Sequence, residues 1–151
     1  MGYVIDNTEF RDNPDVAIGI TFPFNGSGVF NSSFTTVDQS ISNLKNLLLT
    51  QKGERYLIPT FGTNLVQSLF QPATTELKEF INKDITDAIS YWLPYINIIE
   101  LLIRTFEDDP SLETSINVKL KFSIDQTQSE ESITIIASES GIEFLKGNNE
   151  A

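Results

Sequence analysis

The sequence predicts an α+β domain, in which two main helices and a short one pack on a small antiparallel sheet. Three observations predict this class. Apolar residues recur with helical spacing between residues 36 and 92, and they alternate with polar ones over most of residues 115–138. The helical part precedes the strand part, which is typical of α+β domains. The chain of 151 residues, 40% of them hydrophobic, is long enough to bury one such core.

Helical periodicity marks a first helix and a short second one. Thr36 and Gln39 fit a capping box, in which both side chains bond to free backbone amides at the start of a helix. The apolar face of this helix comprises Val37, Ile41, Leu44 and Leu48. A short helix capped by Thr63 or Asn64 should run to Phe70. The apolar face predicts that the first helix lies on a core.

The longest helix is expected to start at a cap on Thr74 or Thr75 and to end at Pro94. Glu76 and Glu79 lie favourably near its positive end. Its predicted buried stripe comprises Leu77, Ile81, Ile85, Ala88, Ile89 and Trp92. Together with the first helix, it would form the helical layer of the fold.

Three strands are expected after the helices, at residues 96–106, 115–125 and 132–138. The middle strand alternates most cleanly, with Lys119 and Lys121 on its outer face. The strand at residues 96–106 is apolar on both faces. It therefore either lies centrally in a layered sheet or has one face that binds a partner. An antiparallel meander of three strands leaves two edges, and the last edge could accept a neighbour's strand.

The chain is expected to form a single domain at residues 16–138, between a polar N-terminal arm at residues 1–15 and an acidic C-terminal tail at residues 139–151. Two short extended segments, at residues 16–24 and 29–34, should open the domain. We expect no secretory signal, and no apolar run approaches the roughly 20 residues that a membrane-spanning helix needs.

The composition excludes several function classes. The formal net charge of −11 argues against nucleic acid and anionic membranes as partners, because both attract Lys and Arg. The chain has neither cysteine nor histidine, so thiolate chemistry, histidine metal sites and histidine-based catalysis are excluded, and no metal or cofactor is expected. Carboxylate catalysis remains, with Glu54, Glu100 and Glu143 as candidates flanked by apolar residues. We expect these carboxylates to be solvated or paired, Glu100 with Arg104 or a neighbouring cation.

The segment at residues 47–70 combines the largest number of signals. A helix end, an extended piece before a proline and a tight turn follow one another there, an arrangement that usually presents residues to a partner. The signature residues are Gly53, Glu54, Arg55, Pro59, Phe61 and Gly62. The glycines permit the turns. Arg55 either faces a partner or clamps a carboxylate within the domain.

This spaced combination resembles a baseplate wedge family of contractile injection machines, which includes the small wedge protein of T4-like phage tails and the baseplate protein of type VI secretion systems. The family pattern reads roughly "I..LL.T..GER...P.FG..L...LF", and residues 43–70 match nearly all of it. The resemblance includes a Gly-Ile-Thr-Phe-Pro-Phe run at residues 19–24, similar to the "GFPF" opening of many members, and covers roughly residues 18–137. The combination is specific, whereas "GER" or "PxFG" alone would carry no weight.

One motif departs from the family pattern. Members usually carry Glu-Pro-Arg at the end of the long helix, and those charges are associated with docking onto the helical core bundle of the wedge. Here the position reads Leu93-Pro94-Tyr95, so only the proline is kept. The contact would then be rebuilt with Trp92 and Tyr95 as interface anchors, unless both pack in the core at the helix–strand junction. This replacement and the "GFPF"-like opening favour a phage tail over a secretion system.

The resemblance implies a structural component and not an enzyme. Family members have a fold similar to the strand-exchanging part of tail sheath proteins, dock on other wedge and core-bundle proteins, and template the first sheath layer by strand pairing. It also implies six copies in a ring, a place in the tail baseplate of the virion, and assembly in the host cytoplasm. The implied interface residues are Gly53, Glu54, Arg55, Pro59, Phe61, Gly62, Trp92, Pro94 and Tyr95.

Two other functions stay open from the sequence. Some members of the family are labelled lysozyme-like, so the alternative is a peptidoglycan-cleaving hydrolase that uses paired carboxylates. The third possibility is a free adaptor module whose apolar strand binds an unrelated partner. Removal of residues 126–151 should abolish sheath growth if the chain templates the sheath, whereas Glu-to-Gln changes should abolish lysis if it is a hydrolase.

Overall fold

The structure is a computed structural model, and it describes residues 17–21, 32–105, 107–112, 115–125, 130–138 and 141–147. The chain divides into two compact units, Met1–Asn43 and Leu44–Ala151. The predicted boundaries at residues 15 and 138 stay predictions, and the N-terminal arm lies outside the described residues. None of the described helices is both long enough and apolar enough to cross a membrane.

In the first unit, two short strands pair antiparallel, β1 (Gly19–Ile20) with β2 (Ser32–Ser33). They lie within the two extended segments that the sequence predicts. Ser33 Oγ donates to Gln39 Oε1, and Gln39 Nε2 donates to Asn43 Oδ1 at 2.8 Å. The side chain of Gln39 is therefore engaged in a polar chain and does not cap a helix.

Helix α1 (Thr36–Leu49) is capped by Thr35, one position before the predicted cap Thr36. Thr35 Oγ1 accepts a hydrogen bond from the Asp38 backbone amide at 3.1 Å and donates to Asp38 Oδ2 at 2.7 Å. The predicted capping box of Thr36 and Gln39 was thus wrong by one position. Adjacent threonines each have a polar side chain three residues later, so the sequence offers both pairs and does not choose between them.

Two helices follow in the second unit, α2 (Leu65–Ser68) and α3 (Thr75–Trp92). Thr74 Oγ1 accepts from the Leu77 amide at 3.3 Å, so one of the two predicted caps of α3 is confirmed. Asn64 precedes α2 without a side-chain cap bond, contrary to expectation, because its side chain turns to α3. The predicted stripe of α3 is buried from Leu77 to Ile89, whereas Trp92 is half-buried.

The sheet of the second unit has four antiparallel strands in the order β3-β4-β5-β6. Their bounds are β3 Ile96–Arg104, β4 Ile116–Ile124, β5 Glu130–Ser138 and β6 Gly141–Lys146, with a 3₁₀ turn, η1 (Pro110–Leu112), between β3 and β4. The expected number of three strands was wrong. The fourth strand lies in the predicted tail, where only Ile142 and Phe144 alternate inward opposite Ala137 and Ile135. That pattern is too short to mark a strand in an acidic segment.

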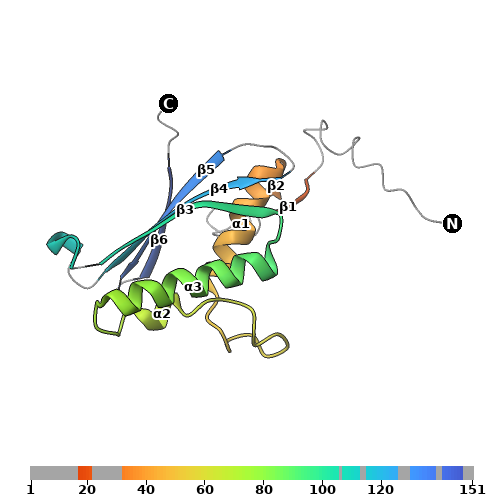
Figure 1. Ribbon diagram of the computed structural model, residues 1–151. Helices are drawn as coiled ribbons and strands as arrows, with labels where there is room; N and C mark the ends of the chain where they lie inside the picture. Colours follow the sequence, from red (N-terminus) through yellow and green to blue (C-terminus); the bar gives the residue numbers. More distant parts are fainter. Residues whose placement is uncertain are drawn as a thin grey trace. The chain divides into compact units, whose positions relative to one another are not determined.

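One face of the sheet is apolar and packs against the helices. Every second residue of β4, from Ile116 to Ile124, is buried, as predicted. Helix α3 packs against β3, and Figure 1 shows it running beneath the sheet. The α+β class with helices on one face is therefore confirmed. Strand β3 forms an edge of the sheet, which excludes the central position considered for it.

Candidate functional site

The signature residues lie in a closed loop between α1 and α2. The Lys52 amide donates to Thr63 O at 3.2 Å, and the Thr63 amide donates to Thr50 O at 2.9 Å, so the two ends of the loop pair with each other. Thr63 Oγ1 also donates to Leu48 O at 3.1 Å, a free carbonyl of the last turn of α1. Loops with such paired ends are compact and are often functional.

Two glycines give the loop its shape for different reasons. Gly62 is buried at a φ of 116°, and a Cβ there would lie 2.2 Å from Thr50 O. Gly53 has a φ of 90° with open space around it, so only its backbone conformation requires glycine. The Gly53 amide donates to Pro59 O at 2.7 Å and closes the middle of the loop. Residues 54–58 form the tip beyond this bond.

Glu54 and Arg55 both act within the loop and its neighbours. Glu54 Oε2 accepts from the Gln51 amide at 3.1 Å and so closes a turn. The Arg55 guanidinium lies 3.9 Å from the ring centre of Phe61, and its Nη2 donates to Asn46 Oδ1 at 3.1 Å. Among the described residues Arg55 makes no salt bridge, so the carboxylate clamp considered from the sequence is not formed there. The charged guanidinium of Arg55 thus connects the loop to α1 by its hydrogen bond to the Asn46 amide oxygen, and it stacks on Phe61 within the loop.

The aromatic contacts continue from the loop to the end of α3. The ring of Phe61 meets Trp92 edge to face, with 5.2 Å between ring centres, and Trp92 meets Tyr91 at 4.9 Å. The structure thus brings Trp92 together with the loop signature. Pro94 is exposed, and Tyr95 is half-buried where the chain enters β3, with its carbonyl accepting from the Asp125 amide at 3.2 Å. Pro94 and Tyr95 do not line the groove that lies between the loop and the last turns of α3.

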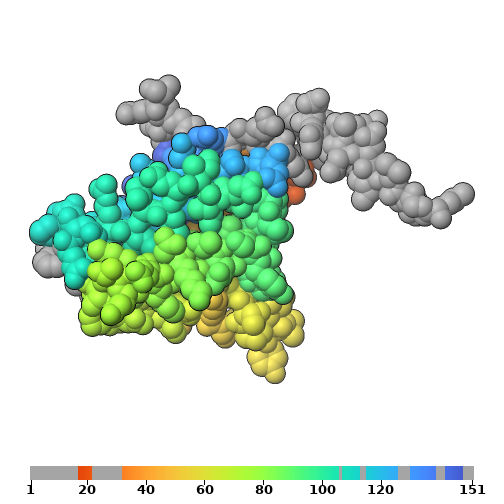
Figure 2. Space-filling model, in the orientation of Figure 1, coloured from red at the N-terminus to blue at the C-terminus, as the bar shows by residue number. Residues whose placement is uncertain are grey.

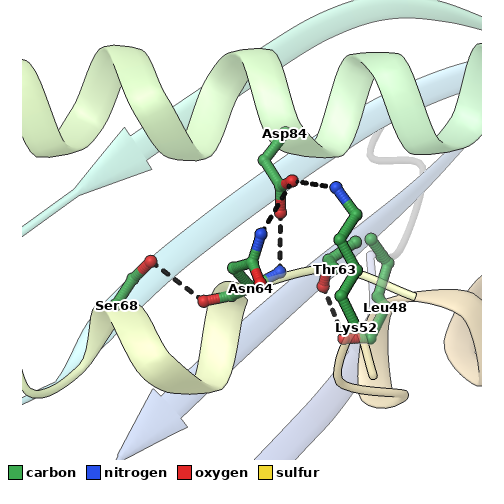
Figure 3. A network of polar contacts seen from close by, with 6 residues as sticks. All are labelled: Leu48, Lys52, Thr63, Asn64, Ser68 and Asp84. Atoms are coloured by element: carbon green, nitrogen blue, oxygen red, sulfur yellow. Dashed lines mark hydrogen bonds and ion pairs between the residues drawn. The ribbon is translucent and has the colours of Figure 1, made fainter. Parts of the chain in front are cut away.

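A buried carboxylate that the sequence did not single out fastens the base of the loop to α3. Asp84 accepts from the Asn64 amide at 2.6 Å, from Asn64 Nδ2 at 3.2 Å, and from Lys52 Nζ (Figure 3). Its position in the sequence carried a signal: it lies three residues after Ile81 on the apolar stripe of α3. A charged residue on a buried stripe needs partners, and the loop supplies them.

A groove of about 570 Å³ opens between the loop and the last turns of α3. It is lined by Lys52, Pro59, Thr60, Asp87, Ala88, Tyr91 and Trp92. The side chains of Pro59, Ala88 and Trp92 give it apolar surface, and Lys52 and Asp87 make it charged elsewhere. A concave surface of this kind suits an inserted apolar side chain of a partner.

The tip of the loop is apolar and projects into solvent beside this groove. The side chains of Tyr56 and Leu57 are 96% and 89% exposed, and Ile58 is also exposed. Figure 2 shows the loop as a protrusion, in yellow, at the lower edge of the molecule. Adjacent exposed apolar residues on a projecting loop are typical of a surface that another molecule covers.

The described residues show no enclosed site for a metal ion or for carboxylate chemistry. No group of three or more acidic side chains among them is placed to hold a metal ion. The three candidate carboxylates, Glu54, Glu100 and Glu143, are all exposed. Glu100 lies opposite Lys121 on β4, a neighbouring cation of the kind expected.

Two comparisons with known proteins agree with this architecture. The model of the family described as baseplate wedge protein gp25 matches residues 35–129. Among solved structures, the chain is similar to a candidate tail lysozyme from Geobacter sulfurreducens, with a TM-score of 0.58 at 15% sequence identity, over 78% of this chain and 96% of that chain. At this identity the likeness shows the fold alone. None of the curated proteins matches the chain.

Proposed function

The chain belongs to the baseplate wedge protein gp25 family, and from that premise we propose how it works within a contractile tail. Membership makes it a structural phage baseplate protein, located in the virion tail and in contact with other baseplate components. We propose that it docks on the wedge core through the signature loop and the groove beside α3. We further propose that a free edge of its sheet templates the first layer of the tail sheath. Six copies in a ring and assembly in the host cytoplasm belong to the same proposal.

The exposed tip of the signature loop carries the docking proposal. Tyr56 and Leu57 would bury large apolar side chains in the complex, which is where most binding energy in protein interfaces arises. The side chain of Trp92 packs against Phe61 and so supports the loop. Because Trp92 is only half-buried, its side chain also lines the groove. Gly53, Gly62, Glu54 and the other signature residues would then act by shaping this surface.

The open edges of the sheet support the templating proposal. Within the described parts of the chain, strands β3 and β6 each pair on one side only, so each offers backbone groups along its other side. Strand β3 carries a bulge between Ile98 and Glu100, an irregularity that hinders pairing with another strand. Strand β6 has a continuous register from Gly141 to Lys146. We therefore favour β6 as the edge that receives a sheath strand.

We propose that the chain is not a hydrolase. A glycosidase needs two carboxyl groups flanking one sugar bond, one of them in apolar surroundings that keep it protonated. The side chains of Glu54, Glu100 and Glu143 are exposed. The carboxylate of Glu54 also accepts a hydrogen bond from the Gln51 backbone amide. A cell-wall lysis assay on the purified parent protein and on Glu54→Gln tests this directly. Lysis that depends on Glu54 would overturn the proposal.

Quantitative mass spectrometry on gradient-purified tail particles tests docking. The parent protein should be present in a fixed ratio to other baseplate proteins and far below the sheath subunit. A Tyr56→Ser/Leu57→Ser variant should be incorporated at least about tenfold less, because it loses the apolar anchors without losing internal contacts. Phe70→Ser, an aromatic that is 75% exposed outside the loop, is the matched control and should be incorporated like the parent. Absence of the parent from intact particles would refute the baseplate role, and normal incorporation of the double variant would refute docking by the tip.

Two truncations test templating. A chain that ends at Gly147 keeps β6, and a chain that ends at Ser138 removes it. We expect the longer chain to support sheath growth and the shorter one to enter baseplates without sheath. Circular dichroism of both proteins verifies that each one folds. Full-length sheath on baseplates that contain the shorter chain would refute β6 as the template.

A further inference from the structure

A small pocket of about 200 Å³ lies on the outer face of the sheet, opposite the apolar face. It is lined by Leu102, Arg104, Asn117, Lys119 and Thr134. These residues come from three neighbouring strands. Arg104 lies opposite Asn117, and Lys119 lies between Leu102 on β3 and Thr134 on β5. Since residues opposite each other on paired strands project to the same face, the five side chains lie together on the outer face of the sheet.

The polar groups of this pocket are suited to an anion. The side chains of Arg104 and Lys119 carry full positive charges, and Asn117 and Thr134 add an amide and a hydroxyl that can donate hydrogen bonds. Among the residues that the structure describes, no acidic side chain lines the pocket. In a chain with 21 acidic and 10 basic residues, two cations in one pocket without a carboxylate is an unusual arrangement.

Most other described cations have a partner. The ion pairs are Lys52 with Asp84, Lys78 with Asp108 and Glu107, Lys121 with Glu130, and Lys146 with Glu131. Neither Arg104 nor Lys119 makes an ion pair with a described residue. The charge of Arg104 contributes to a lower pKa of Asp109, but that carboxylate is held mainly by hydrogen bonds from Ser111. No carboxylate of the described residues thus pairs with either cation of the pocket, which leaves both to an outside carboxylate.

We propose that this pocket binds an aspartate or glutamate side chain of a partner protein, between the Arg104 guanidinium and the Lys119 ammonium. The planar guanidinium of an arginine matches the two oxygens of a carboxylate, and the lysine ammonium adds a second positive charge. Leu102 at the pocket and Leu145 opposite Thr134 on β6 are both exposed. These leucines provide apolar contacts on either side, so the surface fits an acidic residue that is flanked by apolar residues better than it fits a free ion.

The remaining charges of the chain favour this ligand over a nucleic acid. With a net charge of −11, the molecule repels a phosphate backbone at long range, whereas one carboxylate needs only the two local cations. The binding face is separate from the groove beside α3. The proposal therefore goes beyond the docking and templating roles and does not depend on them.

Chemical-shift titration of the ¹⁵N-labelled full chain tests the proposal with defined probes. The probes are acetyl-Leu-Glu-Leu-amide, the same peptide with Gln in place of Glu, and inorganic phosphate. The Glu peptide should shift the amides of residues 102–104, 117–119 and 134 in a saturable way, with a dissociation constant of about 1 mM, as expected for a single small contact site. Raising the salt from about 0.05 M to about 0.5 M should weaken this binding severalfold, because exposed charges are screened.

Matched variants separate this pocket from general charge effects. Arg104→Gln/Lys119→Gln should weaken binding of the Glu peptide at least about fivefold, and the Gln peptide should bind the parent at least about fivefold more weakly. Lys52→Gln removes a lysine that lies in the groove beside α3 and does not line this pocket, and it should bind the Glu peptide like the parent. The proposal is overturned if the Glu peptide causes no saturable shifts or if the double variant binds it like the parent. It is also overturned if phosphate binds at these residues while the Glu peptide does not.

Discussion

Replacing Asp84 with alanine should destabilise the protein strongly, because this carboxylate satisfies several donors at the base of the signature loop. The change removes the acceptor of the Asn64 amide at 2.6 Å and of Asn64 Nδ2 at 3.2 Å, and it breaks the pair with Lys52. A buried amide left without an acceptor costs about 1–3 kcal/mol, and a lost hydrogen bond to a charged group costs a similar amount. Because Lys52 is 36% exposed and can turn to water, its share is small. We therefore expect a loss of about 2–4 kcal/mol in the free energy of unfolding.

The assay is urea and thermal unfolding, followed by circular dichroism and by the fluorescence of the single tryptophan. A loss of this size lowers the Tm by about 5–15 °C in a chain of this length. Lys52→Gln is the matched control, since Asp84 then keeps both bonds to Asn64 and the cost should be about 1 kcal/mol or less. If Lys52→Gln were as damaging as Asp84→Ala, the ion pair would be the main contribution and the argument from the Asn64 amide would be wrong. A loss below about 1 kcal/mol in Asp84→Ala would also refute it.

Two further predictions concern the loop glycines and the acid limit of stability. Gly62→Ala should lower the free energy of unfolding by about 3 kcal/mol or more, and Gly53→Ala by only about 1–2 kcal/mol. Both glycines have a positive φ, but only at Gly62 would the added Cβ also lie against a backbone oxygen. Equal losses in urea unfolding would contradict this. Hydrogen bonds from the Lys78 side chain and the Thr105 amide hold the pKa of Asp108 below its usual 3.8, so its contribution to stability is present above that value and is lost as the pH falls through the lower folded pKa. An NMR titration of Lys78→Gln should show the pKa of Asp108 moved back toward 3.8, and an unchanged pKa would contradict the assigned cause.

The sequence predicted the elements whose signals are periodic and long. The stripe from Leu77 to Ile89 and the alternation from Ile116 to Ile124 each repeat several times, so burial follows the pattern almost residue by residue. The cap on Thr74 was also found, because a polar residue before an apolar-periodic run has few other uses. The position of the signature loop between α1 and α2 followed from its punctuation by glycine and proline.

The errors concern features that depend on contacts distant in sequence. Strand β6 forms because β5 presents a free edge and an apolar row that Phe144 extends, and no local signal at residues 141–146 reveals that edge. Asn64 has the right residue type to cap α2, but the buried carboxylate of Asp84, 20 residues away, binds its side chain instead. The stacking of Arg55 on Phe61 also depends on the fold of the loop. In each case the choice between two local options is made by a tertiary partner.

The internal bonding of the signature loop explains how it can keep an apolar tip in solvent. A flexible loop with Tyr56 and Leu57 at its tip could fold back to bury them, and ordering it on a partner would cost binding energy for each immobilised residue. Here the paired ends, the bond from the Gly53 amide to Pro59 O and the anchor at Asp84 already restrict the backbone. Binding then gains the apolar contact without much of that ordering cost. Changes at the base should therefore weaken both folding and docking, whereas changes at the tip should weaken docking alone.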